Sequence, residues 1–94
     1  MNRVMVPIAK HIIFKGTVQG VGFRFTVFGV ASRLQLKGFV RNLHDGTVEM
    51  VVQGPQSDVK SCIEDINGSF SDDIETEIKD IDYNPKYSDF KITF

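Results

Sequence analysis

The sequence has few residues that could form a disulfide, hold a metal or cross a membrane. Its single cysteine, Cys62, cannot form an internal disulfide, which fits a reducing compartment, and we expect a cytoplasmic protein. Its only histidines, His11 and His44, have no recognisable partner ligand in the sequence, so no metal site is expected. No apolar run approaches the ~20 residues that span a bilayer, so we expect no membrane association.

The chain is also too short for a second domain. Its 94 residues are enough for one domain with a buried core, and we expect a single monomeric domain over residues 1–94. Pro7 and Lys10 interrupt the N-terminal apolar character before a secretory core could form. We therefore interpret residues 1–9 as a short N-terminal extension.

Charge is divided unevenly along the chain. Residues 1–54 hold seven Lys and Arg against two Asp and Glu, whereas residues 55–94 hold four against ten. The basic half would attract a small anion, and the acidic half argues against binding long nucleic acid. The acidic segment from Asp72 to Asp82 is most simply a solvated surface, with binding of a partner or a cation as the alternative.

Hydrophobic periodicity predicts seven elements. Alternation indicates strands, and apolar residues spaced three and four apart indicate helices. We expect a strand at 10–15, a helix at 23–36, strands at 38–43 and 47–53, a helix opening at Gly54-Pro55 and stopping at Gly68, a loop at 69–73, and strands at 76–83 and 90–94. The order βαββαβ plus one strand predicts an α+β sandwich of ferredoxin-like topology. Two helices would pack on one face of an antiparallel sheet, with a short extra C-terminal strand.

A glycine-rich loop lies between the first expected strand and the first expected helix. Glycine can turn backbone N–H groups inward, the helix start adds a positive dipole, and Arg24 supplies a planar fork of donors. The segment is therefore a candidate phosphate site. Its donors would be the Arg24 side chain and the backbone amides of Gln19, Gly20, Val21, Gly22, Phe23 and Arg24.

The absence of certain motifs limits the reactions that this site could catalyse. There is no Gly-x-x-x-x-Gly-Lys-[Ser/Thr] motif, which makes a P-loop nucleotide triphosphatase improbable. A site without a metal or an obvious acid or base suits a leaving group that needs no proton, such as the carboxylate of an acyl phosphate. Asn42 could orient a water molecule but could not deprotonate it. Taken separately, the loop could serve only a turn, and Asn42 could be only a turn residue.

Two segments together resemble the acylphosphatase family. Residues 16–24 match the pattern G-x-V-Q-G-V-x-F-R, and residues 38–49 match G-x-V-x-N-x-x-D-G-x-V-E at every fixed position. The resemblance implies a ferredoxin-like enzyme that hydrolyses acyl phosphates to carboxylate and inorganic phosphate without a cofactor. It also implies that Arg24 binds the phosphate and that Asn42 positions the attacking water. Thr17, Gly22 and Phe39 are mild departures that remove no catalytic group.

Three other functions remain as alternatives. Ferredoxin-like sheets also bind RNA, but the aromatic RNA-binding pattern is absent here. The same module occurs at the front of larger carbamoyl-transfer maturation proteins, where it handles carbamoyl phosphate. A structural module without activity is the third alternative.

Overall fold

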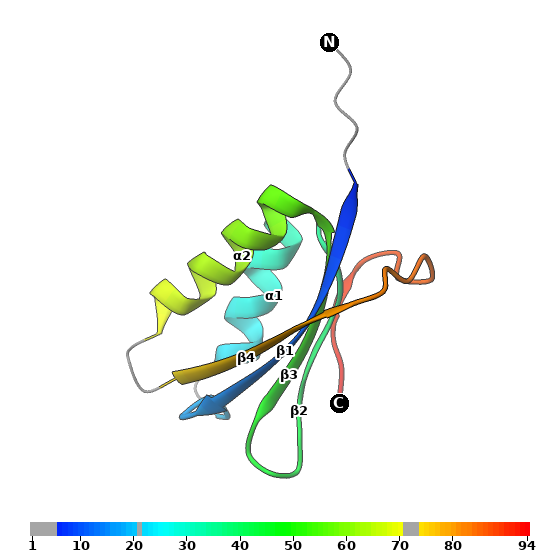
Figure 1. Ribbon diagram of the computed structural model, residues 1–94. Coiled ribbons are helices and arrows are strands. Elements are labelled where there is room, and N and C mark those ends of the chain that lie inside the picture. The colour runs from blue at the N-terminus through cyan, green and yellow to red at the C-terminus, as the bar shows by residue number, and fades with distance from the viewer. Residues whose placement is uncertain (1–5, 21, 71–73) are drawn as a thin grey trace.

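The computed structural model describes residues 6–20, 22–70 and 74–94, which form two helices and five strands. In chain order these are β1 (Pro7–Gly16), α1 (Phe23–Arg33), β2 (Lys37–Asn42), β3 (Val48–Pro55), α2 (Gln56–Ser69), β4 (Ile74–Ile81) and β5 (Phe90–Ile92). Both helices lie on the same side of a twisted sheet (Figure 1). The expected ferredoxin-like α+β fold is therefore confirmed.

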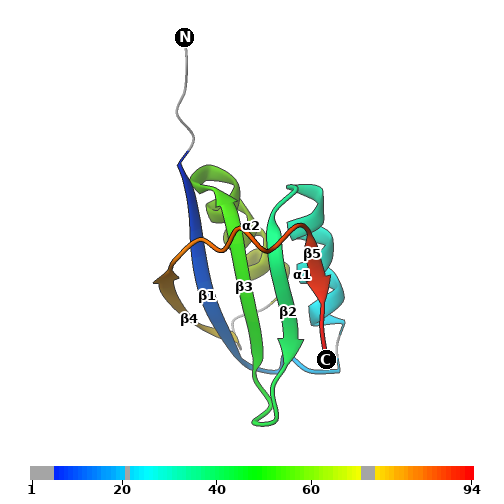
Figure 2. The same cartoon turned by 90° about the vertical axis from the view of Figure 1, so that its right-hand side faces the viewer.

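The sheet is mixed rather than fully antiparallel, which corrects one part of the expectation. Its strand order is β4-β1-β3-β2-β5, and the first three pairings are antiparallel while β5 runs parallel to β2. After β4 the chain crosses the sheet face opposite the helices and enters β5 at the far edge (Figure 2). Because of this crossing, β5 runs in the opposite direction to β4 and in the same direction as β2. The strands β2 and β5 therefore end on the same side of the molecule.

Several elements have other bounds than the sequence indicated. β1 begins at Pro7, so residues 7–9 belong to the strand and not to the expected N-terminal extension. α1 stops at Arg33, because Gln35 takes a left-handed φ of 58° and the Leu36 amide closes the helix on the Ala31 carbonyl (2.9 Å). The expected loop at 69–73 and the acidic residues Asp72 and Asp73 lie partly or wholly outside the described residues.

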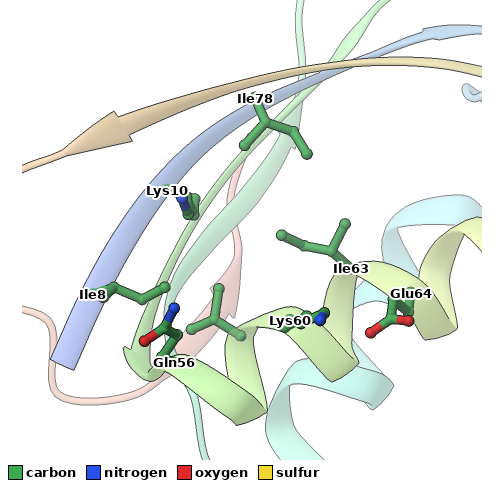
Figure 3. A pocket seen from close by; sticks show the side chains of 8 residues that line it. Ile8, Lys10, Gln56, Lys60, Ile63, Glu64 and Ile78 are labelled. Carbon is green, nitrogen blue, oxygen red and sulfur yellow. The ribbon is translucent and has the colours of Figure 1, made fainter. Parts of the chain in front are cut away.

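The second helix leaves part of the sheet uncovered. β4 is an edge strand, and Ile78, which faces the helices, remains 46% exposed. Beside it, side chains of β1, β4 and α2 enclose a cavity of about 290 Å³ (Figure 3). Its lining consists of Ile8, Lys10, Gln56, Val59, Lys60, Ile63, Glu64 and Ile78.

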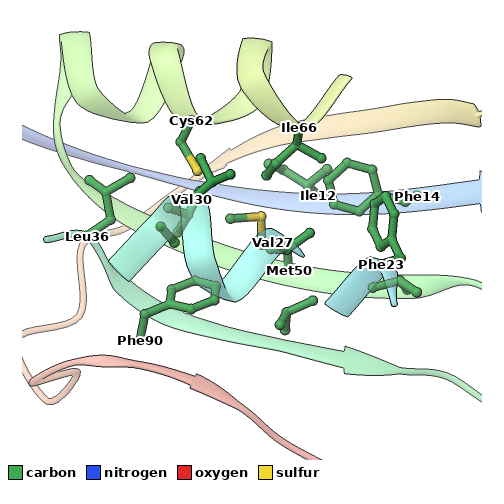
Figure 4. Close-up of a cluster of buried hydrophobic side chains, with 14 of the residues drawn as sticks. Ile12, Phe14, Phe23, Val27, Val30, Leu36, Met50, Cys62, Ile66 and Phe90 are labelled. Carbon is green, nitrogen blue, oxygen red and sulfur yellow. The ribbon is translucent and has the colours of Figure 1, made fainter. Parts of the chain in front are cut away.

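The core fills the space between the two helices and the middle strands (Figure 4). Phe14 of β1 and Phe23 of α1 are almost fully buried, and their rings meet edge to face at a centroid distance of 4.9 Å. Gly38 allows β2 to lie against β3, because a Cβ at this position would come within 1.9 Å of the Val51 carbonyl oxygen. The first contact fixes the start of α1 against β1, and the second sets how closely β2 lies against β3.

Candidate functional site

The segment between β1 and α1 has the glycine conformations that the sequence suggested. Gly20 and Gly22 adopt φ values of 77° and 74°, which favour glycine. Gly22 is the N-cap of α1, and no side chain caps the helix start among the described residues. The first amides of α1 therefore have no side-chain acceptor, which is the usual condition of an anion site. Val21, whose amide the sequence also nominated, lies outside the described residues.

Buried residues hold this loop at both ends. Val18 is 1% exposed and its amide bonds to the Gly16 carbonyl at 3.0 Å, while Phe23 packs in the core. Gly20 and Gly22 between them are exposed to solvent. The loop therefore presents backbone to solvent while its neighbours keep it in place.

The Gln19 side chain connects the loop to the β2–β3 hairpin. Its Nε2 donates two hydrogen bonds, one to the Leu43 carbonyl at 2.9 Å and one to the Thr47 carbonyl at 2.8 Å. The sequence nominated only the backbone amide of Gln19, because neither periodicity nor motif spacing tells where a loop side chain points. These two bonds bring the loop to the residue that directly follows Asn42.

Asn42 is the last residue of β2, paired opposite Val48. Alternation along the strand places it on the face of Val40, which is the buried, helix-facing side. Its Oδ1 atom is buried and has no hydrogen-bond partner among the described residues. Because an unpaired buried acceptor costs about 1–3 kcal/mol, this oxygen is a natural position for a bound water or ligand.

Arg24 lies on the first turn of α1, beside the loop. Its guanidinium carbon is 5.1 Å from the centroid of the Phe94 ring, within the range of a cation–π contact. Phe94 follows β5, in which Ile92 pairs with Val40 of β2, so the chain after β5 runs toward the end of the sheet where Asn42 lies. The loop, Arg24 and Asn42 therefore gather at one end of the sandwich.

A cavity of about 220 Å³ opens at this end. Its lining consists of Val18, Gly20, Gly22, Phe23, Arg24, Phe25, Ile92 and Phe94. The cavity is thus lined both by two loop glycines with the Arg24 guanidinium and by apolar side chains.

The hairpin after Asn42 is held by its own turn. Asp45 accepts hydrogen bonds from the Thr47 hydroxyl at 2.6 Å and from the Thr47 amide at 3.0 Å. These bonds lower the pKa of the Asp45 carboxyl, so the turn keeps a charged acceptor at neutral pH. A firm turn holds the two carbonyls that Gln19 bonds.

The cysteine and the histidine of β1 lie away from this site. Cys62 is buried in the core, where desolvation raises the pKa of its thiol to about 12. His11 bonds Glu49 at 2.8 Å on the opposite face of the sheet. Across residues 6–20, 22–70 and 74–94, no three His, Cys, Asp or Glu side chains gather as metal ligands would. Within the same ranges, no helix has the length and apolar character to span a membrane.

Fold and site together define a class: a ferredoxin-like α+β domain with an anion-type loop at the start of its first helix. A family model described as Acylphosphatase matches residues 10–92 of this sequence. The chain therefore belongs to the acylphosphatase family, and the expectation of an enzyme of this kind, a hydrolase of acyl phosphates, is confirmed at the level of the family.

Individual relatives agree with this assignment. An acylphosphatase of Moorella thermoacetica is 49% identical over 60 residues, which cover 64% of each chain. One of Picrophilus torridus is 41% identical over 85 residues, covering 87% of this chain and 98% of that protein. The crystal structure of acylphosphatase from Bacillus subtilis aligns with a TM-score of 0.78 at 33% identity, covering 93% of this chain and 99% of that one.

Proposed function

We propose that this protein hydrolyses the carboxyl–phosphate anhydride of acyl phosphates without a metal, with Arg24 and the loop amides holding the phosphate and Asn42 positioning the water. One observation carries the proposal. An uncapped helix start, two left-handed glycines and an unpaired buried amide oxygen meet at one end of the fold. In the part of the chain that the structure describes, the helix start has no side-chain cap and the Asn42 Oδ1 has no hydrogen-bond partner, and a phosphate with an attacking water would supply both.

Phosphate binding would come from the loop and Arg24. Amides from Gln19 to Arg24 donate to the equatorial oxygens, and the guanidinium bonds two of them as a bidentate fork. Each charge-assisted bond contributes about 1.5–3 kcal/mol. Because charge on these oxygens shifts in the transition state, preorganised donors lower the barrier as well as binding substrate.

Asn42 would hold the nucleophile. Its buried Oδ1 accepts a hydrogen bond from a water molecule and turns the water lone pair toward phosphorus. The water oxygen bonds to phosphorus while the phosphorus–oxygen bond to the acyl group breaks. One water proton passes to a phosphate oxygen, so the products are a carboxylate and dihydrogen phosphate.

The departing group needs no general acid. A carboxylate, whose acid has a pKa of about 4, leaves as a stable anion at neutral pH. The oxygen leaving a phosphate monoester is a much stronger base and would require a proton donor. The site is therefore expected to prefer anhydrides to monoesters.

A phosphate-release assay tests this proposal. Acetyl phosphate and benzoyl phosphate are compared with glycerol 3-phosphate, an alkyl monoester, in buffer containing a chelator. We expect release from both acyl phosphates, little from the monoester, and no change when Mg²⁺ is added. Equal release from the monoester, or activity that returns only with Mg²⁺, would contradict the mechanism.

We also propose that the enzyme acts as a cytoplasmic monomer on a small substrate and binds no nucleic acid. The reduced, buried Cys62 fits a reducing compartment. Sedimentation at micromolar concentration should give a mass near 10.6 kDa. A larger species would exclude the monomer.

A further inference from the structure

The cavity beside Arg24 has one wall made of exposed aromatic rings. Phe25 is 74% exposed on α1, and Phe94 is 97% exposed after β5. Isolated exposed apolar residues are ordinary, but two phenylalanines border the same cavity here, with Ile92 beside them. Neither ring contributes to the buried core, so the fold itself does not explain their position.

We infer that this wall is an acyl-binding subsite that selects acyl phosphates with an aromatic or bulky apolar acyl group. The inference rests on the proposed function, because the phosphate defines where the acyl group begins. Gly20, Gly22 and Arg24 line the same cavity as Phe25, Ile92 and Phe94, and the Arg24 guanidinium lies against the Phe94 ring. A phosphate bound by the glycine amides and Arg24 therefore has its acyl group close to the aromatic rings.

The electrostatics of the cavity select against charged acyl groups. Arg24 is the sole charged side chain among the described residues that line it. Its guanidinium would be occupied by the phosphate on one side and lies against the Phe94 ring on another. A free carboxylate elsewhere on the acyl group would thus meet apolar surface, where an unpaired charge is strongly disfavoured.

The size of the cavity suits one ring. Its volume of about 220 Å³ exceeds that of a phenyl group, and an acetyl group would leave most of it filled with water. A ring packed against Phe25 and Phe94 would remove more apolar surface from water than a methyl group can. The gain in affinity should therefore grow with the apolar area of the acyl group.

Binding of stable analogues tests the subsite without requiring turnover. Phenylphosphonate and methylphosphonate share the anionic group and differ in the apolar group, and calorimetry measures both. We expect the protein to bind phenylphosphonate about tenfold more tightly. We expect Phe25→Ala, a change on an exposed helix position, to remove most of this difference. Tyr83→Ala is the control, because Tyr83 is an exposed aromatic residue that does not line the cavity.

Kinetics separate this inference from the proposed function. The ratio of kcat/KM for benzoyl phosphate to that for acetyl phosphate should fall about tenfold in Phe25→Ala. Equal affinity of the unchanged protein for the two phosphonates, or equal losses for both in Phe25→Ala, would overturn the subsite. Binding of phosphonates without hydrolysis of either acyl phosphate would instead overturn the proposed function.

Discussion

Two cavities of this protein differ in how their polar groups are satisfied. One cavity lies between α2 and the strands β1 and β4 and is called the α2 cavity here. Its volume is about 290 Å³, and the volume of the cavity beside Arg24 is about 220 Å³. In the α2 cavity Lys10 is paired with Asp80 of the neighbouring strand, and the other polar side chains, Gln56, Lys60 and Glu64, are exposed on α2, where water can satisfy them. The smaller cavity lies beside the start of α1, which has no side-chain cap, and at the same end of the fold Asn42 Oδ1 has no partner within residues 6–20, 22–70 and 74–94.

This difference indicates where chemistry can occur. The charges of an ion pair already satisfy each other, so they would gain little free energy by binding a substrate. Unpaired donors and acceptors do gain free energy when a ligand bonds to them. Volume alone would not have singled out the cavity beside Arg24, because both the α2 cavity and a hollow of about 500 Å³ between α1 and α2 are larger. The comparison predicts that substitutions beside the loop will impair catalysis and that matched ones beside α2 will not.

The largest effect is expected from Asn42→Ala. The change removes an oxygen that has no hydrogen-bond partner among the residues that the structure describes, so thermal unfolding should stay close to that of the unchanged protein. Turnover should fall by about 10² or more, because the attacking water loses its fixed position. Steady-state hydrolysis of benzoyl phosphate, with circular dichroism to check folding, measures both.

Lys60→Ala is the matched control on the α2 cavity. Lys60 lines that cavity from an exposed position of α2, and its loss should leave kcat within about twofold. If Lys60→Ala and Asn42→Ala reduce turnover equally, the distinction between the two cavities is wrong.

A smaller effect is expected from Arg24→Lys. The charge is retained, but an ammonium cannot reproduce the two parallel bonds of a guanidinium or its stacking on Phe94. The inhibition constant of inorganic phosphate should rise about tenfold. Arg33→Lys, in the last turn of the same helix, should leave it unchanged. Identical phosphate inhibition in Arg24→Lys and the unchanged protein would remove Arg24 from the phosphate site.

The sequence predicted the parts of the fold that depend on local pattern. Alternation and helical spacing indicate all seven elements, and Phe14 and Phe23 follow from them as core residues. The direction of β5 did not follow, because it is set by the path of residues 82–89 across the sheet. The end of α1 was also placed wrongly, since a glutamine in the left-handed conformation carries no strong sequence signal.

In the candidate site, too, some features could be predicted from the sequence and others could not. Arg24 and Asn42 could be nominated because their spacing within two motifs is specific, and the fold brings them to the same end of the sandwich. The two bonds of the Gln19 side chain and the aromatic wall of Phe25 and Phe94 depend on tertiary contacts. The periodicity of the sequence does not predict such contacts.

Gln19→Glu tests whether the connection between the loop and the hairpin matters to catalysis. Glutamate has the same shape but no N–H donors, and its oxygens would face the Leu43 and Thr47 carbonyls. We expect kcat to fall about fivefold to tenfold, because the loop and Asn42 would lose their fixed relation. An unchanged kcat would mean that the two segments keep their places without these bonds. Gln56→Glu, beside the α2 cavity, is the control.

The smallest effect is expected at a polar group that is fully paired. Glu49 on the other face of the sheet bonds His11 at 2.8 Å and Arg41 at 2.6 Å. Burial raises the pKa of Glu49, but these two bonds outweigh burial, so the pKa lies below its usual value. Because the folded pKa is lowered, the stabilisation is complete above the unfolded pKa and is lost as pH falls through the folded value.

Glu49→Gln should therefore change stability and leave the site alone. Since Gln cannot carry the charge that His11 and Arg41 bond, we expect a loss of about 1 kcal/mol in the free energy of unfolding near neutral pH. Denaturant titrations between about pH 5 and pH 3 should show this difference shrinking, because the unchanged protein then protonates Glu49. Glu64→Gln on the exposed face of α2 provides the reference curve. A large fall in kcat for Glu49→Gln would show that paired groups on the outer face also serve the reaction, and the contrast between satisfied and unsatisfied polar groups would then no longer identify the site.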